Sequence, residues 1–518
     1  SFFWSGAGNM YRVPKDGTAH SIFNLSLWIG GMVGGEVRMA ASTYGPFEYW
    51  PGPIPDDGKP PRDCTSYDRL YKVTRTDLAD YEATGTPAPD LAEWPWQLGA
   101  PVVDGDGNSG NYDLANGDRP ALVGEQIVWW IMNDAGGEHA VSLTQPIGME
   151  VRVTASAISR ETFSSLFGST YAFLDALDHT TFYRVQLRYR AAQPLEDAYV
   201  GFYSDVDLGN AHDDLVGSDT TLGLAFSYNG DDFDAGADGY GERPPAIGYD
   251  IVRGLRAAPD GIDNDGDGGV DEAGERIGMT NFVVPVKDGP RRLCCSGKEI
   301  YQALRSIWGD DSPVTFGGEG YGGDVPTGFM YPGMPPDYWS MENIDQSGGR
   351  IPPSDKRFLF SMGPVTMQPG EVQDFTLAIV WARGDDRYGS IRLLKAADGL
   401  IQMGVDWGLL DPDKRWLDVS GIGSPLMNRQ YIRSGLGASH PNPVVGSSTI
   451  PFELVDQAHV RISVYDVLGR AVAQLVDEVR SAGPHEVTFD TDGLTPGVYF
   501  CRMEALGEMV TGKIIVME

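Results

Sequence analysis

The chain has few cysteines, few lysines and no long hydrophobic run. It has 4 cysteines in 518 residues and no C-x-x-C pair, which excludes a zinc ribbon and a thioredoxin-type motif. No stretch of about 18 apolar residues occurs, so no transmembrane segment is predicted. Only 9 of the 39 basic residues are lysines, and 73 acidic residues give a net charge of −34. This balance excludes nucleic acid as a partner, because phosphate binding needs clustered lysine and arginine.

The sequence motifs of several large enzyme classes are also missing. The chain has no G-x-S-x-G elbow, no H-E-x-x-H pair, no P-loop and no G-x-G-x-x-G after a strand. Its 7 histidines are scattered, and no two have the spacing of a zinc pair. The 73 acidic residues make some close carboxylate pairs unavoidable by chance, so such pairs do not indicate a glycosidase. The sequence therefore favours a protein that is not an enzyme.

Glycine, proline and aromatic residues are abundant instead. The chain has 67 Gly, 35 Pro, 12 Trp, 23 Tyr and 20 Phe, a mixture that favours short strands joined by many turns. At 518 residues it is too long for one core, so two or three domains are expected. The predicted fold class is mainly β: a large multi-stranded β-rich body with long Gly/Asp loops and a few short helices, plus a C-terminal immunoglobulin-like β-sandwich.

Hydrophobic periodicity predicts the individual elements of the body. Met149, Val151 and Val153 alternate with polar residues, which is the period of a half-buried strand. The predicted strands are Ile22–Trp28, Glu36–Ala41, Gln126–Met132, Gly148–Ser156, Phe182–Tyr189, Ala198–Tyr203, Leu222–Tyr228, Phe358–Met362 and Asp374–Trp381. Helical spacing predicts helices at Lys298–Trp308 and Ser390–Leu409, and the second contains two potential breakers, Gly399 and Gly404.

Composition predicts the domain boundaries. Gly, Ser and Pro concentrate in residues 418–441, which are predicted to link a β-rich body, residues 1–430, to a C-terminal domain, residues 442–518. A weaker sub-boundary is predicted near residues 190–195, where strand-rich segments restart. No repeat with a period of 20–50 residues occurs, so a propeller or solenoid is not expected.

The last 80 or so residues contain several spaced motifs in a fixed order. They are His440-Pro441-Asn442-Pro443, the strand and turn Val460–Arg470, the turns Gly483-Pro484 and Pro496-Gly497, and Lys513–Val516. Within the second motif, Val460, Ile462 and Val464 alternate with more polar residues. Short strands at this spacing predict an antiparallel sandwich of immunoglobulin type.

With these motifs, residues 436–518 resemble the C-terminal sorting domain of cargo proteins of the bacterial type IX secretion system. The resemblance implies that the type IX machinery is a partner and that the protein is secreted, extracellular or attached to the cell surface. A removed signal peptide is expected for such a chain, which starts at Ser1. The body is similar to large exported proteins with the same domain, in Leu27–Gly31, Trp94–Trp96, Ser204–Gly209 and Pro245–Asp250. That similarity implies no particular activity.

Residues 260–272 form the sharpest candidate for a metal site. Carboxylates at every second position of a Gly-rich loop can surround a calcium ion, and the D-x-D-x-D-G core is that of an EF-hand loop. With Asp263 counted as position 1, position 12 is Gly274 where an EF-hand has Glu; Glu272 or Glu275 could substitute, so the pattern is closer to the calcium turns of extracellular repeat proteins. The alternative is a solvated acidic loop, although like charges this close repel without a cation. The predicted ligands are Asp260, Asp263, Asp265, Asp267, Asp271 and Glu272.

Two further acidic clusters are weaker calcium candidates. The first is Asp104, Asp106 and Asn108, with Asp113 and Asp118 nearby, and the second is Asp205, Asp207 and Asp213, with Asp214 and Asp219 nearby. The alternative for each is an ordinary turn built from Asp and Gly. A structural role is expected for calcium in all three places, since a bound ion favours the folded state of a loop that buries little apolar area.

Aromatic pairs and the first residues raise two further possibilities. Trp94 with Trp96, Trp129 with Trp130, and Tyr49 with Trp50 are interpreted as core packing, with a stacking platform for sugars as the alternative. The apolar segment Ser1–Trp4 is expected to tuck into its own body or into a neighbouring subunit by strand addition.

The cysteines are expected to differ in role. Cys64 is a disulfide candidate with either Cys294 or Cys295 in an oxidising exterior, and Cys501 is expected to be a buried apolar residue.

Together these features predict a secreted structural protein of the cell surface, stabilised by calcium and self-assembling as a homo-oligomer or polymer, such as a filament or layer. The alternatives are an exported carbohydrate-binding or carbohydrate-degrading protein, with a glycan as its partner, and a monomeric adhesin.

Overall fold

The structure is a computed structural model of the chain, and it divides into two compact units. The first contains residues 1–168 and 174–398, and the second contains residues 169–173 and 399–518. The described residues are 3–4, 10–45, 47–55, 64–122, 124–161, 177–258, 275–286, 289–293, 296–406, 435–436, 439, 442, 444, 446–454, 458–466, 470–481, 483–505 and 508–516.

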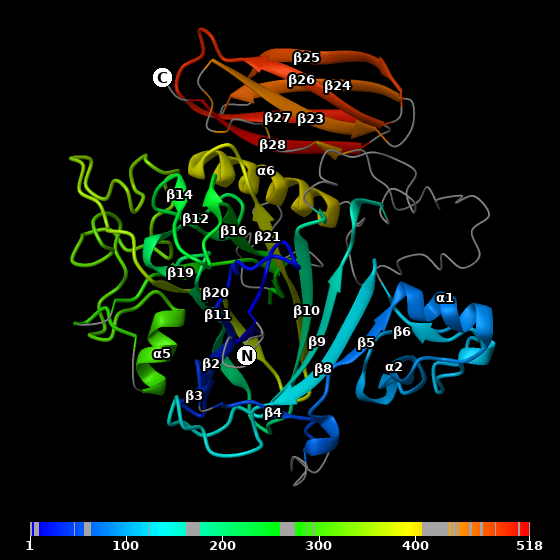
Figure 1. Ribbon diagram of the computed structural model, residues 1–518. Coiled ribbons are helices and arrows are strands. Elements are labelled where there is room, and N and C mark those ends of the chain that lie inside the picture. Colours follow the sequence, from blue (N-terminus) through cyan, green and yellow to red (C-terminus); the bar gives the residue numbers. More distant parts are fainter. Residues whose placement is uncertain are drawn as a thin grey trace. The chain divides into compact units, whose positions relative to one another are not determined.

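A six-stranded sheet forms one layer of the first unit (Figure 1). Its strands lie in the order β1-β2-β11-β20-β19, and β3 also pairs with β2. The central strand β11 is antiparallel to both neighbours, and its Phe202 lies opposite Leu27 and Phe360. The strands are β1 (Phe3–Trp4), β2 (Asn24–Val33), β3 (Glu36–Ala40), β11 (Leu195–Val206), β19 (Asn281–Val283) and β20 (Lys356–Met367).

A nine-stranded antiparallel sheet forms the second layer, in the order β12-β13-β16-β21-β10-β9-β8-β4, with β5 also paired to β8. Its strands are β4 (Trp50–Pro51), β5 (Tyr71–Thr74), β8 (Gln126–Asn133), β9 (Met149–Ala157), β10 (Thr180–Tyr189), β12 (Asp214–Asp219), β13 (Leu224–Asn229), β16 (Ala246–Arg253) and β21 (Val372–Ala382). Short strands also pair within the connecting loops. These pairs are β6 (Val102–Val103) with β7 (Arg119–Pro120), β14 (Phe233–Asp234) with β15 (Gly241–Glu242), and β17 (Leu255–Arg256) with β18 (Arg276–Ile277).

Aromatic side chains fill the space between the two sheets. Phe202 of β11 stacks on Phe360 of β20, with ring centroids 5.3 Å apart, and meets Phe375 of β21 edge-on at 5.9 Å. Tyr249 of β16 meets Phe358 of β20 edge-on at 5.3 Å. All five rings are fully buried, and burial of such large apolar surfaces is a main source of folding free energy. The first unit is therefore a β-sandwich.

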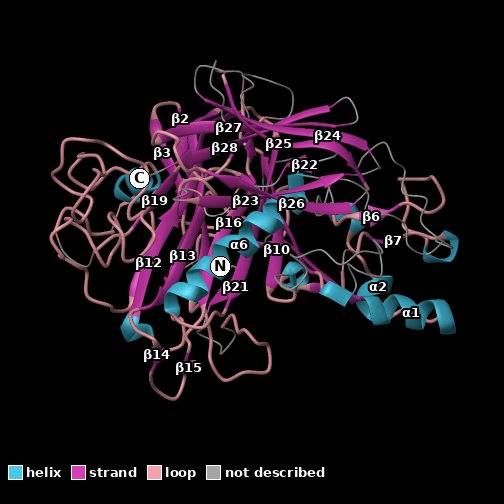
Figure 2. Ribbon diagram, turned by 90° about the horizontal axis from the view of Figure 1, so that it is seen from above, coloured by secondary structure: helices cyan, strands magenta, loops and turns pink. Residues whose placement is uncertain are grey.

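Two helices cover the outer faces of this sandwich. On the six-stranded sheet, α5 (Gly297–Leu304) packs Tyr301 and Leu304 into a cluster with Trp28 and Tyr203. On the nine-stranded sheet, α6 (Arg387–Asp406) lies over β13 and β16 (Figure 2): its Leu394 lies against Gly248, and its Lys395 lies over the ring of Phe226. A Cβ at Gly248 would lie 3.2 Å from Leu394, so glycine permits the close approach of the helix.

Residues 64–122 form a satellite layer with its own small core beside β5 and β8. It contains α1 (Arg75–Thr84) and α2 (Pro89–Ala92), and its core includes Leu91, Trp94 and Trp129. A capping box between Thr74 and Asp77 begins α1, and Gly85 in the left-handed conformation ends it. Periodicity missed this helix because α1 has no fully buried face, although the capping residues were a readable signal.

The second unit is an antiparallel sandwich of two small sheets, in the orders β22-β23-β26 and β25-β24-β27-β28. Val460, Ile462 and Val464 are fully buried in its core, which confirms the predicted alternation, and Cys501 is buried as expected. The strands are β22 (Gly435–Leu436), β23 (Ser447–Leu454), β24 (Ala458–Asp466), β25 (Ala471–Arg480), β26 (Gly483–Asp490), β27 (Gly497–Ala505) and β28 (Glu508–Val516).

The predicted fold class is confirmed: the chain is mainly β, and its C-terminal sheets form a small sandwich. The predicted helices correspond to α5 and α6, and α6 continues through Gly399 and Gly404 because its Ile391, Leu394 and Ile401 are fully buried. Residues 190–195 lie inside the first unit, between β10 and β11 of different sheets. Most of the linker predicted at residues 418–441 lies outside the described residues. Among the described helices, none combines the length and the apolar character needed to cross a membrane.

Candidate functional site

Three carboxylates meet where β11 ends and β20 begins. Asp205 and Asp207 come from the end of β11 and the following loop, and Asp355 immediately precedes β20. One ligand oxygen from each residue lies within 4.8 Å of the other two. The pairing of β11 with β20 brings them together, since Asp205 lies opposite Arg357 in the register. The sequence predicted the first two residues, and the structure adds Asp355.

The neighbours of this acidic cluster compensate only part of its charge. Arg357 contacts two of the carboxylates, with Nε 3.2 Å from Oδ1 of Asp205 and Nη2 donating to Oδ2 of Asp355 at 3.0 Å. Tyr44 donates a hydrogen bond from Oη to Oδ2 of Asp205 at 2.5 Å. Within the described part of the chain, Oδ1 of Asp205 and Oδ1 of Asp355 accept no hydrogen bond. Oδ1 of Asp205 is already in ion-pair contact with Arg357, so of these two oxygens among the described residues Oδ1 of Asp355 is the one open to a cation.

Burial dominates the electrostatics of Asp205, whose residue surface is only 3% exposed. This burial raises the pKa of Asp205 to about 7, and the nearby charges of Asp355 and Asp207 raise it further, against the opposing effects of Tyr44 and Arg357. A bound divalent cation would favour the ionised carboxylate. The donor set consists of oxygen atoms alone, which is what calcium prefers.

A second group of carboxylates lies in the loop between β6 and β7. Ligand oxygens of Asp104, Asp106 and Asp118 lie within 4.8 Å of one another. Asp118 is buried and accepts the N–H groups of Gly105 at 2.9 Å and Asp113 at 2.7 Å. It therefore closes the loop, whereas Asp104 and Asp106 are partly or fully exposed and face solvent as well as each other.

Two other predicted ligands have different surroundings. Asn108 accepts the N–H of Gly110 at 3.2 Å, as expected of a turn residue. Asp213 accepts a hydrogen bond from Nδ2 of Asn210 at 3.1 Å and lies outside the group formed by Asp205, Asp207 and Asp355. The strongest sequence candidate, comprising Asp260, Asp263, Asp265, Asp267, Asp271 and Glu272, lies outside the described residues, as do Cys294 and Cys295.

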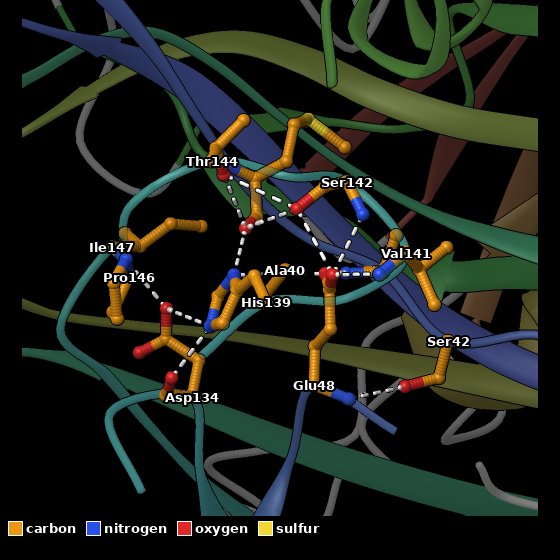
Figure 3. Close-up of polar contacts among 12 residues, drawn as sticks. Ala40, Ser42, Glu48, Asp134, His139, Val141, Ser142, Thr144, Pro146 and Ile147 are labelled. Carbon is orange, nitrogen blue, oxygen red and sulfur yellow. Dashed lines mark hydrogen bonds and ion pairs between the residues drawn. The ribbon is translucent and has the colours of Figure 1, made fainter. Parts of the chain in front are cut away.

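Sequence analysis missed a buried network of Glu48, His139 and Asp134 (Figure 3). His139 lies in the loop between β8 and β9, with Nδ1 2.6 Å from the carbonyl oxygen of Met39 in β3 and Nε2 2.7 Å from the carbonyl oxygen of Asp134. The carboxylates of Glu48 and Asp134 lie 3.6 Å and 3.8 Å from the ring nitrogens. All three side chains are fully buried, so the network has no access for a substrate.

The two carboxylates of this network are held by backbone donors. Glu48 Oε1 accepts the N–H groups of Val141 at 2.8 Å and Ser142 at 2.7 Å, and Oε2 accepts that of Ala41 at 2.7 Å. Asp134 accepts the N–H groups of Ile147, Gly148 and Met149 at 2.5–2.9 Å. Burial raises the pKa of Asp134, while these donors and His139 act in the opposite direction. The only sequence signal for this loop was the turn dipeptide Gly136-Gly137.

The predicted aromatic pairs are mostly packing residues. Trp94 and Trp129 are almost fully buried in the satellite core, which confirms the favoured interpretation for them. Trp50 is half-buried and lies over His139, with ring centroids 6.0 Å apart. Phe3 and Trp4 form β1, which pairs with β2 of the same chain.

Comparison with known proteins identifies the C-terminal part of the chain. Residues 439–517 match the family described as "Secretion system C-terminal sorting domain". The protein is therefore exported by the type IX route to the cell surface, as the sequence predicted. No curated protein is significantly similar in sequence to this chain.

Among solved structures, the chain is similar to one titled a polysaccharide lyase. The sequence identity is 7% and the TM-score is 0.24. The match covers 71% of this chain and 34% of the lyase, so the chain spans about a third of that protein. A likeness at this level supports no statement about activity.

Proposed function

We propose that this exported protein is a structural component of the cell surface whose β-sandwich body is stabilised by bound calcium and which assembles with further copies of itself. One observation carries the proposal: Asp205, Asp207 and Asp355 are gathered at the ends of two central strands, with a single guanidinium among them. Three carboxylates this close repel one another, and Arg357 offsets only part of that repulsion. Calcium bound there would join the end of β11 to the start of β20.

The position of the cluster indicates a stabilising role. β11 and β20 lie next to each other in the centre of the six-stranded sheet, and both contribute aromatic side chains to the core. An ion that binds only the folded state stabilises it by mass action, by about 2.7 kcal/mol at a hundredfold excess over Kd. The second group, Asp104, Asp106 and Asp118, would fix the loop between β6 and β7 in the same way.

Assembly is supported by the edge position of β1. Within the described residues, Phe3 pairs with Leu25 and Trp4 pairs with Asn24 to join β1 to β2. An edge strand can be exchanged for the same segment of a second copy, and strand addition of this kind builds continuous sheets between subunits. Electron microscopy of the native material with and without EDTA tests this part, because dispersed single particles in both conditions would contradict it.

The calcium part is tested by thermal unfolding in EDTA and in CaCl2. Calcium should raise the melting temperature of the wild-type protein by several degrees. Asp355→Asn should melt no lower than the wild type in EDTA, because one repulsive charge is gone, and should gain less from calcium. Asp324→Asn, an exposed carboxylate far along the chain from Asp355, is the matched control and should behave like the wild type. Equal calcium responses in all three proteins would reject this cluster as a calcium site.

A further inference from the structure

The hydrogen bonds of His139 determine how many protons its ring carries. Nδ1 lies 2.6 Å from the carbonyl oxygen of Met39, and Nε2 lies 2.7 Å from the carbonyl oxygen of Asp134. A carbonyl oxygen can only accept a hydrogen bond, so each ring nitrogen must donate one. A neutral imidazole has a single N–H, and it would place a nitrogen lone pair against a carbonyl oxygen at one of these two contacts.

The charges around the ring lead to the same conclusion. Glu48 and Asp134 each accept three backbone N–H groups, so the oxygens that face this loop act as hydrogen-bond acceptors. Arg38 on β3 is paired with the exposed Glu36 at 3.9 Å, and its Nη1 donates to the carbonyl oxygen of Pro146 at 3.2 Å. Among the described residues, only His139 lies within ion-pair distance of Glu48 and Asp134, and buried charges without compensation are strongly unfavourable.

The charged groups nearest in the chain, Glu36 beside Arg38 and Glu138 beside His139, are exposed, and the buried phenols next to the network supply no charge. Tyr49 follows Glu48 in the sequence, and burial together with Asp134 and Glu48 raises its pKa well above the ordinary value. Burial also raises the pKa of Tyr189 on β10, which feels the opposing charges of Arg38 and Asp134. The indole of Trp50 lies over the imidazole at an interplanar angle of 23° and offers its electron-rich face to a cation.

We propose that His139 is a buried imidazolium that latches the 134–149 loop onto β3, and that the latch opens when a rise in pH removes one of its two ring protons. The ring of His139 joins the loop to the carbonyl group of Met39. Glu48 joins the same loop to Ala41, because its carboxylate accepts the N–H of Ser142 in the loop and the N–H of Ala41 after β3. With one proton removed, one of the two carbonyl contacts becomes repulsive and one of the carboxylates loses its counter-charge. The loop should then leave β3, whereas mild acid leaves the latch closed.

Nitrogen NMR of the wild-type protein, labelled with ¹⁵N in histidine alone, tests the protonation state directly. At pH 8, well above the ordinary histidine pKa of about 6.5, one of the 7 histidines should still show two protonated ring nitrogens. That signal should be absent from the His139→Gln variant and present in His212→Gln, whose histidine is exposed. A His139 signal with one unprotonated nitrogen at pH 8 would overturn the proposal. If the signal is assigned by its slow N–H exchange, the measurement needs only the wild-type protein and no variant that disturbs folding.

Hydrogen exchange measured by mass spectrometry tests the latch itself. After correction for base catalysis of exchange, the peptide covering residues 134–149 should lose protection in the wild type as the pH is raised towards 10, and residues 180–189 of β10 should not. His139→Gln should exchange in this peptide about 10-fold faster or more at pH 7, as expected for the loss of a hydrogen bond to a charged group. Wild-type protection in His139→Gln, or an unchanged loop at high pH, would each show that no such latch exists.

Discussion

Tyr44 donates a hydrogen bond of 2.5 Å to Asp205, and the same hydroxyl lies 2.8 Å from Nε of Arg357. The phenol hydroxyl therefore contacts both the most buried carboxylate of the acidic cluster and Arg357, which also contact each other directly. Because Tyr44 lies in the loop after β3, far from Asp205 in the sequence, this contact fastens that loop to the end of β11.

Replacing Tyr44 by Phe should destabilise the protein more at pH 8 than at pH 5. Burial raises the pKa of Asp205 to about 7, so Asp205 is a neutral acid at pH 5 and a carboxylate at pH 8. A hydrogen bond to a charged group contributes about 1.5–3 kcal/mol, against about 1 kcal/mol for a neutral pair. Urea unfolding in EDTA at the two pH values measures the difference.

A matched control for this prediction is Tyr112→Phe, which removes a phenol that donates to the carbonyl oxygen of Leu91 at 2.9 Å. That acceptor does not titrate, so the loss of stability should be the same at pH 5 and pH 8. An equal loss for Tyr44→Phe at both pH values would mean that Asp205 does not change its charge in this range.

Asp398→Asn should stabilise the protein at neutral pH. Asp398 of α6 is fully buried, and within the described residues neither of its carboxylate oxygens accepts a hydrogen bond. Burial raises the pKa of Asp398 well above its ordinary value, and the nearby charge of Asp219 adds to this. A raised pKa in the folded state contributes stability that is present below about pH 4 and is lost as the pH rises through the folded pKa.

The Asn variant has no such titration, so its stability relative to the wild type should increase from pH 4 to pH 8. The gain should exceed about 1 kcal/mol, since a tenfold difference in proton affinity between the two states corresponds to about 1.4 kcal/mol. Asp337→Asn, at an exposed position, should follow the wild type at every pH. A gain that does not vary with pH would contradict a buried, protonated Asp398.

Local patterns in the sequence predicted the fold well because each depends on residues close together in the chain. The alternation of Met149, Val151 and Val153 predicted β9, and all three side chains are fully buried. Helical spacing likewise located α5 and α6. In α6, packing of Leu394 and Ile401 outweighs the low helix propensity of Gly399, which propensity alone could not reveal.

The candidate sites were only partly predictable for the opposite reason. Asp205 and Asp207 were visible as a local cluster, but Asp355 joins them through the register of β11 with β20. Glu48 and His139 meet because two loops fold over β3, and no spacing in the sequence indicates that contact. Contacts between distant segments follow from strand pairing and packing, which a single sequence does not specify.

Gly136→Ala should destabilise the first unit by about 1–3 kcal/mol. A Cβ at Gly136 would lie 2.4 Å from Cγ of Trp50, so either the indole or the loop would have to move, and Trp50 is the residue that lies over His139. Gly278→Ala is the control, because its Cβ would meet no heavy atom within 4 Å. Chemical denaturation followed by tryptophan fluorescence compares the two variants, and equal stabilities would mean that the loop has room to shift.

Asp118→Ala should open the loop between β6 and β7 to proteolysis. The carboxylate of Asp118 accepts the N–H groups of Gly105 and Asp113 and is almost fully buried, so its removal leaves two backbone donors without a partner from this side chain. Each lost bond of this kind costs about 1–3 kcal/mol, and the cost falls on a loop with little apolar packing. Cleavage within residues 104–117 should therefore become faster in the variant.

The effect of calcium on cleavage distinguishes two possible roles of Asp118: a calcium ligand, and an acceptor of the backbone hydrogen bonds that close the loop. If the group Asp104, Asp106 and Asp118 binds an ion, calcium should slow the cleavage of the wild-type loop and should not slow that of Asp118→Ala. Asp80→Ala, which removes an exposed carboxylate from α1, should leave the cleavage rate and its calcium response unchanged. Faster cleavage of Asp118→Ala with no calcium effect in the wild type would assign Asp118 to the hydrogen-bonded closure of the loop alone, because the lost backbone contacts account for that result without an ion.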